Sequence, residues 1–149
     1  MDNILLLGST LTNNNRGCNA LTLGGICLIC NKYKECNITI LQIDKTEHQT
    51  VDTLSFKNKS VRVKTQYILG KRSYYYAFID LLKYFITGKT NNELILHISK
   101  SDIVYTINAG DGFTDIYGIK RLLQVFIEFI ITFLLKKKIS AFASNNRAV

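Results

Sequence analysis

The sequence has no proline and no tryptophan, and it has only nine glycines among its 149 residues. Without proline and without a glycine repeat, collagen-like chains and proline-rich linkers are excluded. Hydrophobic residues make up 47% of the chain and charged residues 20%, which is enough apolar material to bury a core and argues against disorder. The length predicts one domain.

The sequence also lacks a long uninterrupted hydrophobic run. The longest apolar stretch, residues 122–135, is interrupted by Gln124, Glu128 and Thr132 and falls short of the ~20 residues that a membrane span needs. We expect it to be a core helix. At the amino end only residues 4–7 form an apolar run, which is too short for the core of a signal peptide. The sequence therefore predicts a cytoplasmic protein.

Acidic residues are scarce relative to basic ones. Nineteen lysines and arginines face eleven acids, and the net charge of +8 favours anionic partners such as phosphates, acidic glycans, an anionic membrane surface or nucleic acid. No recognised nucleic-acid motif accompanies the aromatic run 74–76, so we expect no nucleic-acid partner. Peripheral contact with the inner face of a membrane, through charge, stays open.

The four cysteines do not form a metal-binding pattern. Cys27 and Cys30 have the spacing of a metal knuckle, but they lie within an apolar helical pattern, and Cys18 and Cys36 do not supply a second pair. His48 and His97 have no cysteine or second histidine nearby. We expect reduced, structural thiols and no metal.

Strand patterns alternate with helix patterns along the chain. Apolar runs at 3–8, 38–43 and 102–107 predict buried strands, and clean alternation over 61–69 predicts a strand with one face in solvent. Helical spacing predicts helices over 17–33, 75–86, 91–100 and 119–134, the third with a capping box of Thr90 and Glu93.

This alternation predicts an α/β protein with an open, mainly parallel, Rossmann-like sheet and helices on both of its faces. We expect residues 1–138 to form this domain and residues 139–149 to form an irregular tail.

Two polar, glycine-bearing loops, 9–17 and 108–118, follow predicted strands. Ligands of parallel sheets bind outside the carboxyl ends of strands, so we expect these loops to border one crevice. Arg16 and the start of the following helix can hold a phosphate; a solvated connection is the alternative. Asp111 and Asp115 can act as a general base or hold sugar hydroxyls; otherwise Asp111 stabilises a turn and Asp115 caps a helix.

Three segments carry a resemblance to a known family. They read Asn-Ile-Leu-Leu-Leu-Gly at 3–8, Asn-Arg-Gly-Cys-Asn-Ala-Leu at 15–21, and Gly-Asp-Gly-Phe-Thr-Asp-Ile-Tyr-Gly at 110–118, followed by Lys120 and Arg121. Together they resemble the amino-terminal half of the polysaccharide pyruvyl transferase family.

The resemblance implies one half of a glycosyltransferase-B-like enzyme of cell-surface or exopolysaccharide biosynthesis. Such an enzyme moves the enolpyruvyl group of phosphoenolpyruvate onto the hydroxyls of a sugar or glycan acceptor as a pyruvate ketal, with phosphoenolpyruvate as co-substrate and no further cofactor. It implies catalytic roles for Asp111 and Asp115. The substrate-binding positions that it implies are Asn15, Arg16, Gly17, Gly110, Thr114, Tyr117 and Arg121.

Other functions stay open at this point. Asp44, near the end of the second predicted strand, can hold a ribose in a nucleotide- or anion-binding domain. A non-catalytic remnant or interaction module is the other alternative, because half of a cleft does not close over two substrates. We expect the frame to shift near residues 136–138, a carboxyl-terminal domain to be missing, and the chain to be inactive by itself.

Overall fold

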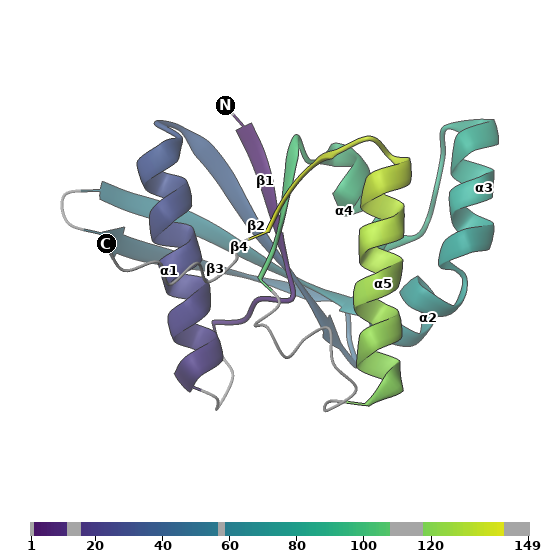
Figure 1. The fold of residues 1–149 in the computed structure, drawn as a ribbon, viewed down its shortest axis with the longest axis horizontal. Helices are drawn as coiled ribbons and strands as arrows, with labels where there is room; N and C mark the ends of the chain where they lie inside the picture. The colour runs from purple at the N-terminus through teal and green to yellow at the C-terminus, as the bar shows by residue number, and fades with distance from the viewer. Residues whose placement is uncertain (1, 12–15, 57–58, 108–117, 142–149) are drawn as a thin grey trace, which may run out of the picture.

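A computed structural model describes residues 2–11, 16–56, 59–107 and 118–141 (Figure 1). In this part of the chain the strands form one six-stranded sheet in the order β3-β4-β2-β1-β5-β6. All neighbours are parallel except β3, which pairs antiparallel with β4. The strands are β1 (Asp2–Leu7), β2 (Cys36–Asp44), β3 (His48–Phe56), β4 (Lys59–Leu69), β5 (Ile103–Thr106) and β6 (Lys138–Ala141). The predicted open, mainly parallel sheet is confirmed.

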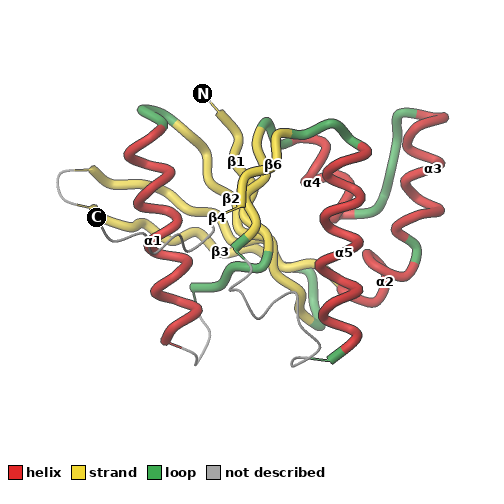
Figure 2. Tube along the Cα trace, viewed as in Figure 1, coloured by secondary structure: helices red, strands yellow, loops and turns green. Residues whose placement is uncertain are grey.

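Helices cover both faces of this sheet, as the alternation of patterns predicts. Figure 2 shows α1 (Arg16–Lys32) on one side of the strands and the remaining described helices on the opposite side. The opposite layer contains α2 (Gly70–Tyr75), α3 (Ala77–Thr87), α4 (Glu93–Lys100) and α5 (Ile119–Leu134).

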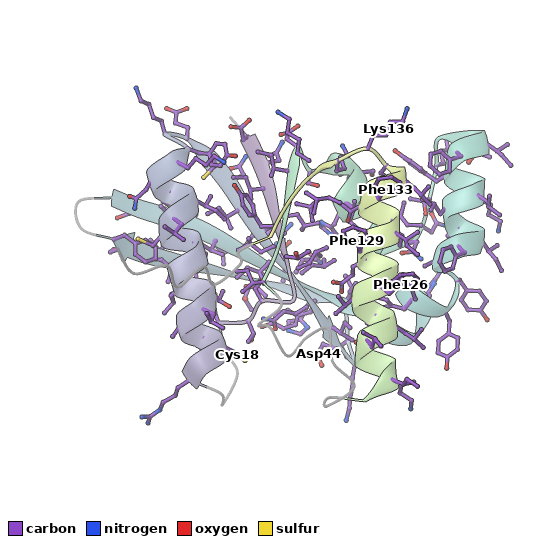
Figure 3. All side chains as sticks on the ribbon, in the orientation of Figure 1. Cys18, Asp44, Phe126, Phe129, Phe133 and Lys136 are labelled. Carbon is purple, nitrogen blue, oxygen red and sulfur yellow. The ribbon has the colours of Figure 1, made fainter. Side chains whose placement is uncertain are left out.

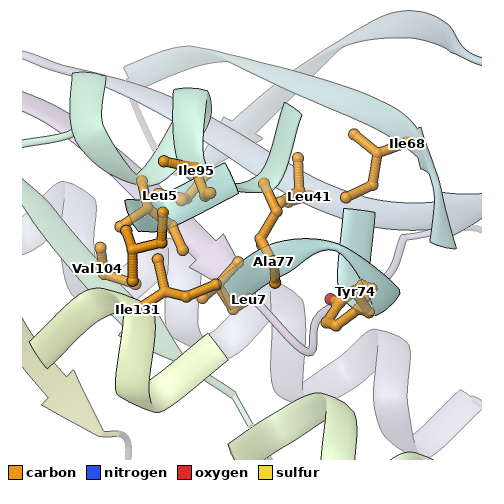
Figure 4. Close-up of a cluster of buried hydrophobic side chains, with 12 residues drawn as sticks. Leu5, Leu7, Leu41, Ile68, Tyr74, Ala77, Ile95, Val104 and Ile131 are labelled. Atoms are coloured by element: carbon orange, nitrogen blue, oxygen red, sulfur yellow. The ribbon is translucent and has the colours of Figure 1, made fainter. Parts of the chain in front are cut away.

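The central strand β1 is buried on both faces. Its residues Ile4, Leu5, Leu6 and Leu7 are each exposed by 1% or less. Successive side chains of a strand point to opposite faces, so a continuous apolar run suits a strand that is covered twice. Ile4 and Leu6 belong to the core under α1, while Leu5 and Leu7 belong to the core under the other helices (Figure 4).

Helix α4 begins at a buried asparagine. The side chain of Asn92 accepts hydrogen bonds from the backbone nitrogens of Leu94 and Ile95, which satisfies two donors of the first helical turn. The predicted capping box of Thr90 and Glu93 is therefore wrong. The hydroxyl of Thr90 instead accepts from the backbone nitrogen of Asn92, ahead of the helix.

The apolar stripe predicted at 75–86 forms one side of α3 and of the residues just before it, but that side faces outward. Helix α3 touches the core through Ala77 and Leu81, on the opposite side. The helix ends at Gly88, whose φ of 68° is the left-handed conformation that glycine adopts most easily. The outward, exposed members are Tyr75, Phe78, Ile79, Leu82, Phe85 and Ile86.

Helix α5 packs on the core, as predicted, but its apolar residues are divided between two sides. Its inner side carries Val125, Glu128, Ile131 and Thr132, all buried, and Ile127 packs half-buried against the same core. Of the predicted apolar stripe, Ile131 is therefore buried, whereas other members face solvent. The exposed apolar residues of the helix are Ile119, Leu123, Phe126, Phe129, Phe133 and Leu134.

Four smaller expectations also need correction. The helical pattern over 17–33 predicts that Leu21 and Leu28 face the core, but both are exposed, and the buried side of α1 includes Ile26 and Cys30. In β4 the face expected in solvent buries Ile68 under the helices. The predictions did not include β3, whose edge position leaves its side chains exposed or half-buried. Residues 139–141 belong to β6 rather than to an irregular tail, and 142–149 lie outside the described residues.

Acidification through the range of histidine titration is expected to destabilise the fold through His97. Burial lowers the pKa of His97 below its ordinary 6.5, and Lys64 and Lys100 act in the same direction, while Glu93 opposes them. The unfolded chain therefore binds more protons than the folded one, and stability falls as the pH drops from about 6.5 toward the lowered pKa.

Chemical denaturation of the wild-type chain and of His97→Gln across this range measures the effect. The variant, which keeps a polar side chain but does not titrate, should show a flatter dependence of the free energy of unfolding on pH. An equal or steeper dependence of the free energy of unfolding on pH in His97→Gln would contradict the destabilising effect of His97.

Candidate functional site

The order of the strands in the sheet determines where a candidate site lies. β1 lies between β2 and β5 and pairs in parallel with both, with Leu7 of β1 opposite Thr106 of β5. The chain leaves β1 through α1 toward β2, and it later returns to the other side of β1 as β5. Connections at such a switch point leave in different directions, and the crevice between them is where open α/β sheets bind ligands.

The loop after β1 is held by a small set of hydrogen bonds. Gly8 has a φ of 71°, which turns the backbone sharply out of the strand. The backbone nitrogen of Thr10 donates to Thr22 Oγ1 at 3.1 Å, and that hydroxyl donates to the carbonyl of Cys18 at 3.0 Å. Gln42 Nε2 donates to the carbonyl of Ser9 at 3.2 Å, which ties the loop to β2.

A cavity of about 380 Å³ opens beside this loop. Its wall combines the loop with the carboxyl end of β2, the end of β4, helix α2 and helix α5. The lining residues are Gly8, Ser9, Thr10, Cys18, Leu41, Gln42, Ile43, Ile68, Tyr74 and Glu128. Backbone groups, hydroxyls, one amide and one carboxyl thus converge on a partly apolar hollow, the usual composition of a small-molecule site.

Glu128 is the acidic member of this wall. It comes from the inner side of α5, only 4% of it is exposed, and the hydroxyl of Tyr74 donates a hydrogen bond to its Oε1. The hydroxyl of Thr132 donates to the backbone carbonyl of Glu128 at 2.7 Å. A carboxyl group in a sheltered hollow is suited to proton transfer, because few water molecules compete for the proton.

Sequence reasoning did not select Glu128 as a site residue. It entered only as an interruption of the apolar stretch 122–135. Helical spacing puts Glu128 on the same side of α5 as Val125, Ile131 and Thr132, but only the structure shows that this side packs inward. An acid at a buried helical position is costly unless it is hydrogen-bonded, so its presence there marks it for attention.

The structure describes some of the predicted site residues and not others. Arg16 and Gly17 form the start of α1 and are exposed; Cys18, next along the helix, reaches the cavity wall. No carboxylate among the described residues lies within ion-pair distance of Arg16. Arg121 belongs to α5. The positions that lie outside the described residues are Asn15, Gly110, Asp111, Thr114, Asp115 and Tyr117.

Asp44, the residue of the nucleotide-binding alternative, is the last residue of β2 and lies at the same edge of the molecule as Cys18 (Figure 3). Its Oδ1 accepts a hydrogen bond from the backbone nitrogen of Lys45 at 2.6 Å, and Oδ2 lies 3.9 Å from His48 Nε2. The ring of His48 stacks on Tyr67 with centroids 4.0 Å apart. Asp44 is thus placed for a ligand at this edge and is already partly engaged.

Two of the four thiols lie close together. Cys18, Cys27 and Cys36 are half-buried and Cys30 is buried, none of the four is in a disulfide, and the thiols of Cys30 and Cys36 share a hydrogen bond. Burial raises the pKa of the Cys36 thiol, and the charge of Asp2 adds to the shift. Within residues 2–11, 16–56, 59–107 and 118–141, no cluster of histidine, cysteine and acidic side chains has the size of a metal site.

None of the helices in the described part of the chain is both long and apolar enough to cross a membrane. Comparison of the chain with family models, curated proteins and solved structures finds no match.

Proposed function

We propose that this chain is the amino-terminal, Rossmann-like half of a polysaccharide pyruvyl transferase, and that the carboxyl edge of its sheet binds the anionic and sugar substrates. The observation that carries the proposal is the pairing of β1 with β5. The family-like segment 15–21 follows β1, and the family-like segment 110–118 follows β5, so both belong to connections that leave adjacent parallel strands. Adjacent strand ends at a switch point are a favourable place for a shared substrate site.

The reaction sets clear requirements for such a site. The methylene carbon of phosphoenolpyruvate takes up a proton, two acceptor hydroxyls form bonds to the neighbouring carbon, and phosphate leaves. Cations must hold the carboxylate and phosphate, and a base must stand near an acceptor hydroxyl. Arg16 is the proposed cation of this half, because its planar guanidinium pairs with oxyanions in two places at once.

Carboxyl groups supply the proposed base. The resemblance favours Asp111 and Asp115 for orienting and deprotonating the acceptor. Glu128 is a third candidate, supported by its place on the cavity wall beside Ser9 and Tyr74. The remaining donor contacts belong, on this proposal, to a carboxyl-terminal domain, so this half binds substrate and does not turn it over alone.

A second candidate function is nucleotide binding. It is favoured by Asp44, because an acid that ends the strand beside β1 is where Rossmann-like domains hold ribose hydroxyls. This second function predicts that the chain binds a nucleotide and that Asp44→Asn weakens the binding.

Replacement of Arg16 by alanine is expected to weaken binding of phosphoenolpyruvate about tenfold or more, because a charge-assisted hydrogen bond contributes ~1.5–3 kcal/mol. Arg16→Lys should restore part of the loss, since it keeps the charge and loses the planar geometry. Isothermal titration calorimetry of the 149-residue chain measures these affinities, with ATP titrated in parallel.

Arg62→Ala is the matched control, because Arg62 is exposed on β4 and its replacement removes the same charge away from the cavity. Equal affinities of the wild-type, Arg16 and Arg62 variants for phosphoenolpyruvate would reject the role of Arg16. Binding of ATP but not phosphoenolpyruvate, with loss in Asp44→Asn, would replace the proposal by the second candidate. Ketal formation by the purified chain alone would refute its inactivity.

A further inference from the structure

The outer sides of α3 and α5 carry an apolar surface that no other described segment of the chain covers. We call it the outer apolar surface, and its members are the exposed residues given above for these two helices. Helix α4 contacts both α3 and α5, so the three helices belong to one layer on the sheet (Figure 1). Phe126, Phe129 and Phe133 follow one another along α5 in Figure 3. Large exposed patches of this kind mark interaction sites.

The charges around this surface have one sign. Neither acid of α3 and α5 is exposed: Asp80 is half-buried and its Oδ2 accepts from Asn92 Nδ2 at 3.0 Å, and Glu128 is buried and accepts from Tyr74. Exposed basic residues lie beside the apolar members and at the helix ends. They are Arg72, Lys83, Lys89, Lys120 and Lys136. An apolar, aromatic face with a basic border is the composition of helices that lie in an anionic membrane interface.

A shallow cavity of about 360 Å³ adjoins the apolar side of α3. It is lined by Arg72, Tyr76, Asp80, Lys83 and Asn91. Two cations, a phenol and an amide can donate hydrogen bonds there to a phosphate group, while the amide of Asn92 already engages the carboxylate of Asp80. The cavity suits the headgroup of an anionic phospholipid whose chains lie against the neighbouring apolar side chains.

A second copy of this chain fits the surface less well. A symmetric dimer through α3 and α5 would bring two basic borders together with no exposed acid on either helix to offset them. We propose that the outer apolar surface docks on an anionic phospholipid bilayer, with the rings and aliphatic side chains of α3 and α5 in the interface and the basic residues on the headgroups.

Vesicle flotation tests the proposal with the full chain. Vesicles of equal parts phosphatidylcholine and phosphatidylglycerol should bind the protein, and pure phosphatidylcholine vesicles should bind it far more weakly. Leu82→Glu should lower the partition coefficient about tenfold or more, because it replaces an apolar side chain that the membrane interface buries on docking with a charged one. Leu28→Glu is the matched control: Leu28 is 59% exposed on α1, across the sheet, and Leu82 is 64% exposed.

The absence of tryptophan provides a second, direct readout. In Phe85→Trp the single indole should shift its emission to shorter wavelength when anionic vesicles are added, and in Leu28→Trp it should not. Equal loss of binding in Leu82→Glu and Leu28→Glu, or no emission shift in Phe85→Trp, would overturn the proposal.

The oligomeric state and the substrate affinity of Leu82→Glu complete the test. A dimer that Leu82→Glu dissociates, without vesicle binding by the wild-type chain, would overturn membrane docking and assign the surface to a second copy. Leu82→Glu should leave phosphoenolpyruvate affinity unchanged, so failure of membrane docking and failure of the proposed function are distinguishable.

Discussion

Asn92→Ala is expected to lower the free energy of unfolding by about 2–4 kcal/mol. The side chain of Asn92 is 3% exposed and joins three elements: it caps α4, donates to the carbonyl of Ser73 at 3.0 Å, and donates to Asp80 Oδ2 at 3.0 Å. Loss of a cap costs ~1 kcal/mol, and each buried acceptor that loses its donor adds to this. Urea denaturation followed by circular dichroism measures the change.

Asn91→Ala is the matched control, because Asn91 is exposed and precedes the cap by one residue. It should change stability by less than about 0.5 kcal/mol, as surface substitutions do. Asn92→Asp separates the two roles of the amide: it keeps the acceptor for the backbone of α4 but places a carboxylate against Asp80. If Asn92→Asp is as stable as the wild type, capping alone explains the residue.

Tyr74→Phe is expected to cost about 1–3 kcal/mol, the range for a buried acceptor that loses its donor. The variant removes the hydroxyl that donates to Glu128 and leaves the ring in the core cluster that it shares with Leu81 and Ile68. Denaturation of Tyr74→Phe, Glu128→Leu and the double variant measures the coupling, which should reach about 1–2 kcal/mol because the two residues share one hydrogen bond.

The double variant should therefore be more stable than the sum of the two single changes predicts, since it removes both polar partners together. Additive effects would show that the hydrogen bond contributes nothing of its own. Titration of phosphoenolpyruvate with Glu128→Gln gives the functional counterpart: a change in affinity without a large change in stability would support a role for Glu128 in the cavity, and unchanged affinity would confine it to the fold.

The sequence determined the elements that depend on local pattern. A continuous apolar run predicted β1 as a strand buried on both faces, and the alternation of strand and helix patterns predicted a mainly parallel sheet with two helical layers. Ser9 and Thr10, in the polar loop after β1, line a cavity, while the shared crevice with the loop 108–118 stays a prediction. The predictions of strands and helices succeed because strand and helix periods are properties of adjacent residues.

Only the tertiary structure decided which side of a helix packs inward. In α3 the predicted apolar side faces outward while Ala77 and Leu81 contact the core. In α5 the predicted stripe is divided, with Ile131 buried and Phe126 exposed. Tertiary packing also brings Asn92 into contact with Asp80 and places Glu128 in the cavity wall. It places β3 at an edge of the sheet, although no apolar pattern in the sequence predicts this strand. Hydrophobic periodicity defines a face of a helix; what that face meets depends on the order of the strands and on partners far away in the chain.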